Sequence, residues 1–166
     1  MKLGIISDTH NLLRPEVLSA VTGVDVILHA GDISSQNVID QLQAIAPVKV
    51  VRGNADKDWA EHLPLFLDFE IDGFHIYMTH KKKDLPKDLG EYDLVITGHS
   101  HQYSAARQGG TVMLNPGSCG PRRFTQPITF ALAETESNEI RITKIDIPHA
   151  ASGENSDSSS ANGKKM

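Results

Sequence analysis

Short apolar runs alternate with helix-like segments along the first third of the chain. The runs at residues 3–6, 24–30 and 48–51 are rich in β-branched residues and are typical of buried strands. Between them, residues 15–21 predict a short helix, and residues 35–45 carry apolar side chains at helical spacing behind a serine start signal. This alternation predicts a sheet whose first three strands are parallel.

The pattern changes after residue 65, where strand-like runs follow one another closely. The dipeptides Asp72-Gly73 and Gly109-Gly110 are typical of tight hairpin turns. The strands expected in this half are residues 67–71, 74–78, 94–97, 103–107, 111–114, 128–133 and 140–147. So many strands predict an α/β fold of the α+β kind, with two packed mixed β-sheets flanked by helices in a four-layer α/β/β/α sandwich.

The length of 166 residues and a hydrophobic content of 39% suit one domain with one sizeable core. We expect this domain to span residues 1–147. Residues 148–166 consist largely of Ser, Ala, Gly, Asn and charged residues, whose small apolar surface cannot offset the entropy lost on ordering. A disordered C-terminal tail is therefore expected.

Composition excludes several function classes. A net charge of -5 argues against binding of extended nucleic acid, which needs a surplus of Lys and Arg along one face. Cys119 is the only cysteine, so any metal must be held by nitrogen and oxygen. No stretch approaches the roughly 18 to 20 apolar residues of a membrane span, and the N-terminal run lacks a signal peptide's cleavage segment. We expect a cytoplasmic protein that does not bind membranes.

Side chains that bind metals recur where predicted strands end. These residues are Asp8, His10, Asp32, Asn54, His80, His99 and His101. The carboxyl ends of parallel strands line one crevice, so residues at those ends converge although they are distant in sequence. One His-x-His is more often solvated or packed than metal-bound, but several such signals together, all suited to borderline or hard cations, predict one metal site.

The order of these residues resembles the calcineurin-like metallophosphoesterase superfamily, and the spacing and length resemble its small YfcE-like phosphodiesterases. The resemblance extends to about residue 147. The motifs that carry it are Asp8-Thr9-His10, Gly31-Asp32, Gly53-Asn54, His80, Gly98-His99-Ser100-His101 and Asn115-Pro116-Gly117-Ser118.

The resemblance implies two divalent cations as cofactors. One ion would be held by Asp8, His10 and His101, the other by Asn54, His80 and His99, with Asp32 bridging the two. A carboxylate has two oxygens, so Asp32 can hold two ions at the roughly 3.5 to 4 Å separation of two-metal sites. The resemblance points to Mn²⁺, while Zn²⁺, Fe²⁺, Ni²⁺ and Co²⁺ suit the same ligands.

The implied function is hydrolysis of a small phosphodiester. A water bridging the metals would lose its proton near neutral pH and attack phosphorus in line with the leaving oxygen, with Asp32, Asn54 and His99 acting through the metals. Two alternatives keep the same fold. One is a phosphomonoesterase or nuclease that uses the same site, and the other is a non-catalytic metal-binding scaffold, as in the retromer subunit of similar fold.

The chain departs from the family pattern at the position after Asn54. Many members carry a histidine there that assists the leaving group, whereas this chain has Ala55. Loss of a general acid typically costs about 10²- to 10⁴-fold when the leaving group must be protonated, which disfavours a monoesterase. The next residue, Asp56, either orients a histidine from behind the metal ligands or caps its loop.

Several cations are candidates for substrate binding. Lys81 could attract phosphate at the mouth of the site, although a lysine run is usually a solvated face. Arg122 and Arg123 could hold a non-bridging oxygen with a planar guanidinium group. The exposed edges of the hairpins would allow a homodimer or tetramer.

The remaining histidines and the cysteine are expected to have no catalytic role. We expect His29 to pack beneath the site and Cys119 to be a small packed side chain rather than a nucleophile. His62, His75 and His149 have no companions at strand ends and are expected to be structural or exposed.

Overall fold

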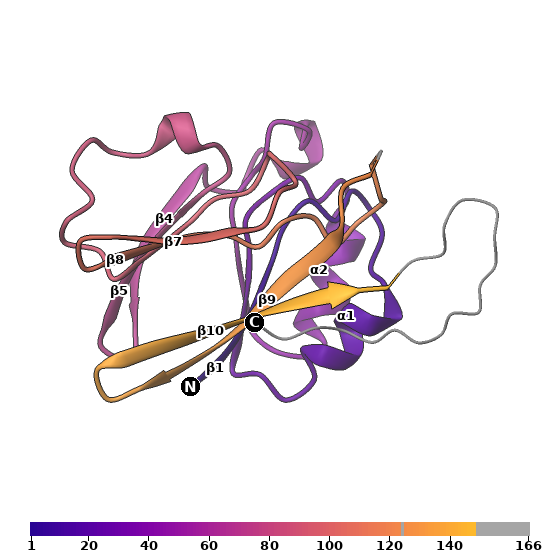
Figure 1. Cartoon of the computed structure of the whole chain (residues 1–166). Helices are drawn as coiled ribbons and strands as arrows, with labels where there is room; N and C mark the ends of the chain where they lie inside the picture. The colour runs from indigo at the N-terminus through magenta and orange to yellow at the C-terminus, as the bar shows by residue number, and fades with distance from the viewer. Residues whose placement is uncertain (124, 149–166) are drawn as a thin grey trace.

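Two mixed β-sheets of five strands each form the body of the protein in a computed structural model that describes residues 1–123 and 125–148 (Figure 1). Sheet A has the order β10-β9-β1-β2-β3, and sheet B has the order β4-β5-β6-β8-β7. The elements are β1 (Lys2–Ile6), α1 (Pro15–Ala20), β2 (Val26–His29), α2 (Gln36–Gln43), β3 (Val48–Val50), η1 (Asp58–Ala60), β4 (Phe66–Ile71), β5 (Phe74–Thr79), η2 (Lys82–Asp84), β6 (Leu94–Ile96), β7 (Ser104–Gln108), β8 (Thr111–Asn115), β9 (Ile128–Glu136) and β10 (Glu139–Ile147).

Sheet A contains the three parallel strands that the sequence predicts. Strand β1 pairs with β2, which pairs with β3, and both pairs are parallel. The β9–β10 hairpin extends this sheet by antiparallel pairing of β9 with β1. Helices α1 and α2 cover one face, where Val17, Val38 and Leu42 are buried against Ile27 and Phe130.

Sheet B combines two hairpins with parallel pairing in its centre. The β4–β5 hairpin turns at Asp72-Gly73, whose φ angles of 51° and 83° are those that a tight hairpin turn requires. Strands β5, β6 and β8 are parallel neighbours. On the outer face, Leu85 and Leu89 pack against Tyr77 and Tyr92, so a loop with a single 3₁₀ turn forms the thin outermost layer on this side.

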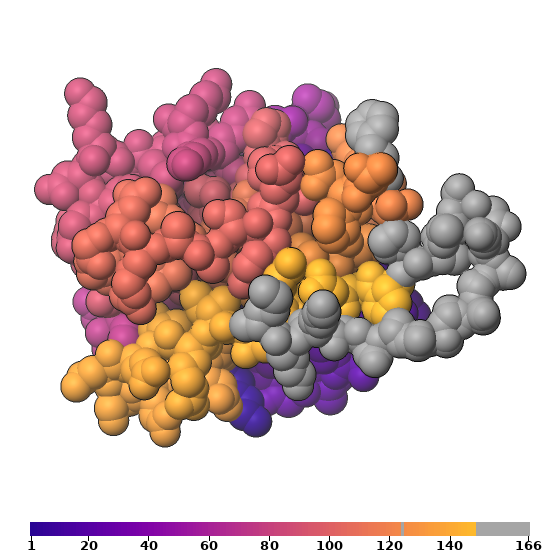
Figure 2. Space-filling model, viewed as in Figure 1, coloured from indigo at the N-terminus to yellow at the C-terminus, as the bar shows by residue number. Residues whose placement is uncertain are grey.

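The core between the sheets is continuous and apolar. Leu3 and Leu28 of sheet A meet Met78, Leu94 and Ile96 of sheet B, and all five side chains are fully buried. Full burial of one such side chain stabilises the fold by about 1.5 to 3 kcal/mol. Figure 2 shows the outside of this arrangement, with the β9–β10 hairpin below the strands of sheet B. The predicted fold class of two packed mixed sheets is confirmed.

The C-terminal tail predicted for residues 148–166 lies outside the described residues from residue 149 onward, as does His149. The domain boundary at residue 147 therefore stays a prediction. No helix within residues 1–123 and 125–148 is long and apolar enough to cross a membrane.

Candidate metal centre

Two groups of potential metal ligands lie at the carboxyl ends of the parallel strands. Each group has three side chains whose donor atoms lie within 4.8 Å of one another. The groups are Asp8 with His10 and His101, and Asp32 with His80 and His99. The seventh predicted ligand, Asn54, places its Oδ1 3.1 Å from His99 Nδ1. The structure thus brings all seven side chains together, and their roles stay predictions.

The loops that carry these side chains are tied to one another through the backbone. The N–H of Asp8 donates to Gly31 O at 2.9 Å, and the N–H of His10 donates to Asp32 O at 3.0 Å. The N–H of Gly98 donates to His80 O at 2.9 Å. These bonds fix the loops after β1 and β2, and those after β5 and β6, as pairs.

The backbone at these positions is unusual. Five of the seven residues have a left-handed conformation, with φ of 57° at Asp8, 44° at His10, 62° at Asp32, 75° at His99 and 65° at His101. Positive φ is uncommon in residues other than glycine, and each instance costs about 1 to 2 kcal/mol. Such strain clusters at functional sites, where the surrounding structure enforces it.

Asp8 presents one free oxygen. Its Oδ2 accepts hydrogen bonds from Ser7 Oγ at 2.6 Å and from the N–H of His99 at 3.1 Å. Its buried Oδ1 has no hydrogen-bond partner and lies 3.3 Å from His101 Nε2 and 3.8 Å from His10 Nε2. Oδ1 is therefore the oxygen available to an ion.

The two carboxylate oxygens of Asp32 have different partners. Its Oδ1 accepts the N–H of Ala55 at 2.8 Å. Its Oδ2 lies 3.2 Å from His80 Nε2 and 3.7 Å from His10 Nε2. Because His10 and His80 belong to different groups, Asp32 Oδ2 lies between the two.

His80 shows why a cation fits here. Its Nδ1 lies 2.7 Å from Ala30 O, which can only accept, so Nδ1 carries a proton. In neutral His80 the lone pair of Nε2 would therefore face Asp32 Oδ2. Buried polar atoms almost always have a partner, yet Nε2 of His80, Nε2 of His10 and Oδ1 of Asp8 have none. A positive charge among these atoms would satisfy all three.

The pKa shifts of the ligand side chains also indicate that the centre favours a positive charge. Burial lowers the pKa of His80, but Asp32 and Asp8 outweigh it and leave this pKa above its ordinary value. Burial raises the pKa of Asp32, but His80 and the Ala55 N–H outweigh it and leave this pKa below its ordinary value. Burial lowers the pKa of His10 despite the two carboxylates. In the centre, Asp32 is therefore ionised and lies beside a group that favours positive charge.

Asp56 is a loop cap, the second of the two interpretations that its position allowed. Its Oδ2 accepts the N–H groups of Asp32 and Gly53, and its Oδ1 accepts those of Ile33 and Ser34, each at 2.9 Å. The carboxylate therefore joins the loop after β2, which carries Asp32, to the loop after β3, which carries Asn54.

Two glycines permit the close approach of these loops. A Cβ at Gly53 would overlap the Oδ1 and backbone nitrogen of Asp32. A Cβ at Gly98 would overlap Ser7 Oγ and approach Asp8 Oδ2 to 2.9 Å. The glycine before Asn54 is thus required by its contact with Asp32, and the glycine before His99 by its contact with Ser7 and Asp8.

His29 lies beneath the centre, as the sequence predicts. The N–H of Gly31 donates to its Nδ1 at 3.1 Å, so its Nε2 carries the proton and donates to Thr9 Oγ1 at 3.0 Å. Burial lowers the pKa of His29 to about 4. A neutral His29 therefore supports Thr9, which stands between Asp8 and His10.

The remaining candidates have different surroundings. Cys119 is buried in the core, where burial raises the pKa of its thiol to about 12, so it is not a thiolate nucleophile. His75 contacts Asp68 on the outer face of sheet B, apart from both ligand groups. Lys81 lines a cavity together with Asn54 and His80.

The two arginines differ in their relation to the ligands. The positive charge of Arg123 contributes to the lowered pKa of His10, which places Arg123 near the first group. Arg122 is exposed, and no hydrogen bond or ion pair joins it to a ligand within the described part of the chain. The substrate-binding roles of Lys81, Arg122 and Arg123 stay predictions.

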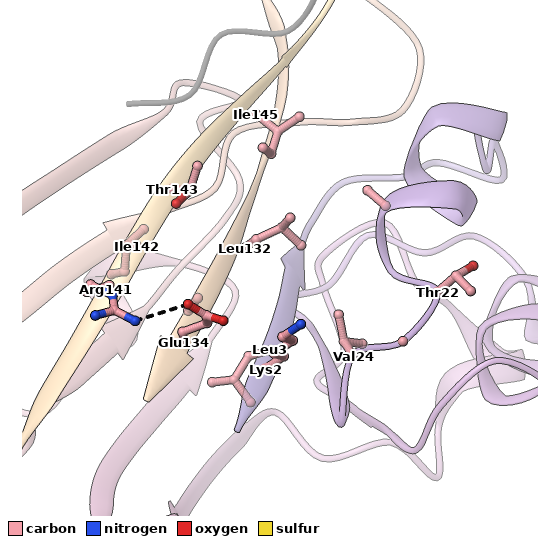
Figure 3. A pocket seen from close by; sticks show the side chains of 13 residues that line it. Lys2, Leu3, Thr22, Val24, Leu132, Glu134, Arg141, Ile142, Thr143 and Ile145 are labelled. Carbon is pink, nitrogen blue, oxygen red and sulfur yellow. Dashed lines mark hydrogen bonds and ion pairs between the residues drawn. The ribbon is translucent and has the colours of Figure 1, made fainter. Parts of the chain in front are cut away.

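A larger cavity lies away from this centre. It has a volume of about 660 Å³ and separates the β9–β10 hairpin from the segment after α1 (Figure 3). Leu132 and Ile145 face Val24 across it, and at one end Arg141 forms an ion pair with Glu134 at 3.1 Å. Neither ligand group borders it, so its size does not make it the metal centre.

Comparisons with known proteins agree with the geometry. Residues 1–138 match the family described as the calcineurin-like phosphoesterase superfamily domain. A probable metallophosphoesterase of Methanothermobacter thermautotrophicus is 36% identical over 147 residues, covering 80% of this chain and 85% of the relative. A phosphodiesterase of Methanocaldococcus jannaschii is 29% identical, covering 85% of this chain and 97% of the relative.

Solved structures show the same likeness. The structure of an archaeal phosphodiesterase is 27% identical with a TM-score of 0.73, covering 89% of this chain and 100% of the other. A single mutant of Vps29 from Entamoeba histolytica is 26% identical with a TM-score of 0.73, covering 88% of this chain and 92% of the other. Because the family match spans most of the sequence, the chain belongs to the calcineurin-like phosphoesterase superfamily, a family of metal-dependent hydrolases.

Proposed function

We propose that this protein is a phosphodiesterase with a binuclear metal centre. One ion would be held by Asp8, His10 and His101, the second by Asn54, His80 and His99, with Asp32 between them. One observation carries the proposal: two buried imidazole nitrogens without hydrogen-bond partners, His10 Nε2 and His80 Nε2, each lie 3.2 to 3.9 Å from both Asp8 Oδ1 and Asp32 Oδ2.

The chain's own groups would divide the work as follows. Asp32 Oδ2 lies beside histidines of both groups, so this single oxygen could contact both ions. Ser7 Oγ and the His99 N–H hold Asp8 in place through its other oxygen. When bound, two divalent ions would supply Lewis acidity that lowers the pKa of water and stabilises the negative charge on the phosphoryl oxygens during in-line attack.

The substrate would be a phosphodiester with a leaving group that departs without a protein acid. Ala55 stands where a histidine could have protonated the leaving oxygen, and its backbone N–H is already bonded to Asp32. Relatives named phosphodiesterases agree with this choice. We propose Mn²⁺ as the activating metal, the ion to which the family resemblance points; the imidazole, carboxylate and amide ligands suit first-row divalent ions as a class. The proposed catalytic domain spans residues 1–147.

The test replaces Asp32 with asparagine. Asp32→Asn keeps the shape of the side chain and an acceptor for the Ala55 N–H, but it removes the negative charge between the ligand groups. Hydrolysis of bis-p-nitrophenyl phosphate in Mn²⁺ should fall by at least about 10²-fold, since electrostatic stabilisation is usually the largest contribution to catalysis. Circular dichroism should show that the fold survives.

The matched control is Asp40→Asn on the exposed side of α2, which should leave hydrolysis unchanged. Unchanged turnover in Asp32→Asn would refute the assignment of the centre. A metal-loaded wild-type protein without activity on any phosphate ester would instead indicate a scaffold.

A further inference from the structure

A second cavity opens directly beside the candidate metal centre. It has a volume of about 340 Å³ and is lined by Asn54 and His80, two of the predicted ligands. Leu65, Phe66 and Tyr77 form its apolar wall, and Lys81 contributes a positive charge. An ester group on a phosphate held at Asn54 and His80 would therefore extend into this cavity.

The wall contains apolar side chains that the fold leaves in contact with water. Leu65 is 58% exposed and Phe66 is 53% exposed, and within residues 1–123 and 125–148 the only other exposed large hydrophobic side chain is Met1, at 43%. Exposed apolar groups gathered in one place mark binding sites more often than chance surface positions. Here the two neighbouring side chains border the cavity next to the metal ligands.

The aromatic rings of the wall are arranged for stacking. Phe66 lies parallel to Tyr77, with ring centroids 5.4 Å apart and an interplanar angle of 11°. Tyr77 is buried against Tyr92 and Val95, whereas Phe66 is exposed. The buried ring of Tyr77 therefore supports the exposed ring of Phe66. A flat ring entering the cavity would find Phe66 as a stacking partner.

The backbone holds this wall in place. Thr79 Oγ1 donates to Leu65 O at 3.0 Å, and the N–H of Arg52 donates to Pro64 O at 2.8 Å. Phe66 is also paired with Thr79 across the β4–β5 ladder. Because His80 follows Thr79 directly, the β4–β5 ladder joins the wall to this predicted ligand.

We propose that this cavity is a subsite for an aromatic ester group of the substrate, so that the enzyme prefers phosphodiesters with a planar ring close to phosphorus. The proposal rests on the proposed phosphodiesterase function. It adds a specificity determinant, Phe66, that takes no part in metal binding. The charged side chains that line the same cavity are Arg52, Lys81 and Asp84, so cations outnumber carboxylates there, which suits an anionic phosphate.

Binding of two non-hydrolysable anions tests the subsite without relying on turnover. Phenylphosphonate and methylphosphonate carry the same phosphonate group and differ only in the ring. Titration calorimetry on the full chain loaded with Mn²⁺ should give about tenfold tighter binding of phenylphosphonate, the effect typical of stacking on one aromatic side chain. In Phe66→Ala this preference should disappear while the affinity for methylphosphonate is unchanged.

The conservative variant Phe66→Tyr keeps a ring and should keep the preference. Equal affinities of the two phosphonates in the wild type, or a preference that persists in Phe66→Ala, would overturn the subsite while leaving the metal centre intact. If the Mn²⁺-loaded wild type bound neither phosphonate, the subsite would be overturned, and the proposed function would fail only if the same protein also left bis-p-nitrophenyl phosphate uncleaved.

Discussion

The left-handed backbone at Asp8, His10, Asp32, His99 and His101 imposes a conformational cost on side chains that gain no burial energy from it. Carboxylates and imidazoles at such positions would be replaced by glycine if stability alone mattered. In this conformation Asp8 and His10 contribute to one ligand group, while His99 and His101 contribute to different groups. The strain is thus consistent with a demand for metal ligands rather than for packing.

His99 allows this cost to be measured. His99→Gly and His99→Ala remove the same imidazole, but only glycine accepts a φ of 75° without strain. In the presence of a chelator, the glycine variant should be more stable by about 1 kcal/mol, which raises Tm by about 2 to 4 °C for a chain of this size. Differential scanning calorimetry of the two metal-free variants provides the comparison.

A helical position gives the reverse order as a control. Gln41 is exposed within α2, where glycine costs about 1 kcal/mol relative to alanine. Gln41→Gly should therefore melt below Gln41→Ala. If the alanine variant at position 99 proved as stable as the glycine variant, the backbone there would not be strained.

The residue types of the site could be predicted from the sequence, but their contacts could not. Asp8, Asp32 and His80 were recognisable because each follows a strand. Nothing local indicated that Asp56 would accept four backbone N–H groups, since these come from two separate loops. Phe66 carried no signal either, because only the folded sheet places it beside His80.

At the scale of helices and strands, short sequence patterns predicted the features that depend on residues close together in the sequence. The turn dipeptide Asp72-Gly73 predicted the β4–β5 hairpin, and the strand–helix alternation predicted the parallel order of β1, β2 and β3. The place of the β9–β10 hairpin beside β1 was not predictable, because that pairing joins residues such as Lys2 and Glu134. Periodicity shows which face of a strand is buried, but not which strand lies next to it.

The loops between elements differ in how much substitution they tolerate, as two glycines should show. Gly73 has open space around its position for a Cβ, so Gly73→Ala should cost only the backbone strain of its φ of 83°. Gly53→Ala would drive a methyl group into Asp32 and displace it. Titration with Mn²⁺ should show weakened binding, by about tenfold or more, in Gly53→Ala alone. Equal affinities in the two variants would contradict this role of Gly53.

At the scale of the whole molecule, each ligand group draws on both sheets. Asp8 and His10 follow β1 of sheet A, while their companion His101 follows β6 of sheet B. In the second group, Asp32 follows β2 of sheet A, while His80 and His99 follow strands of sheet B. Ions bound there would connect the sheets at one end of the sandwich.

Removal of metal should therefore destabilise the whole molecule. A ligand present at a hundredfold excess over its Kd stabilises the native state by about 2.7 kcal/mol. Unfolding should be followed calorimetrically with Mn²⁺ and again with a chelator, and Tm should be higher with Mn²⁺. In Asp32→Asn the difference should shrink, and an identical Tm in both conditions for the wild type would argue against binding at this position.

Because each ligand group draws on both sheets, the packing between the sheets should affect the rate of turnover. Met78 and Ile96 fill the space between the sheets, and they precede His80 and His99 by two and three positions. A bulkier or smaller side chain there would alter the gap between the two sheets, and with it the distance between the two proposed ions. Catalytic speed could thus be tuned by substitutions that never meet the substrate.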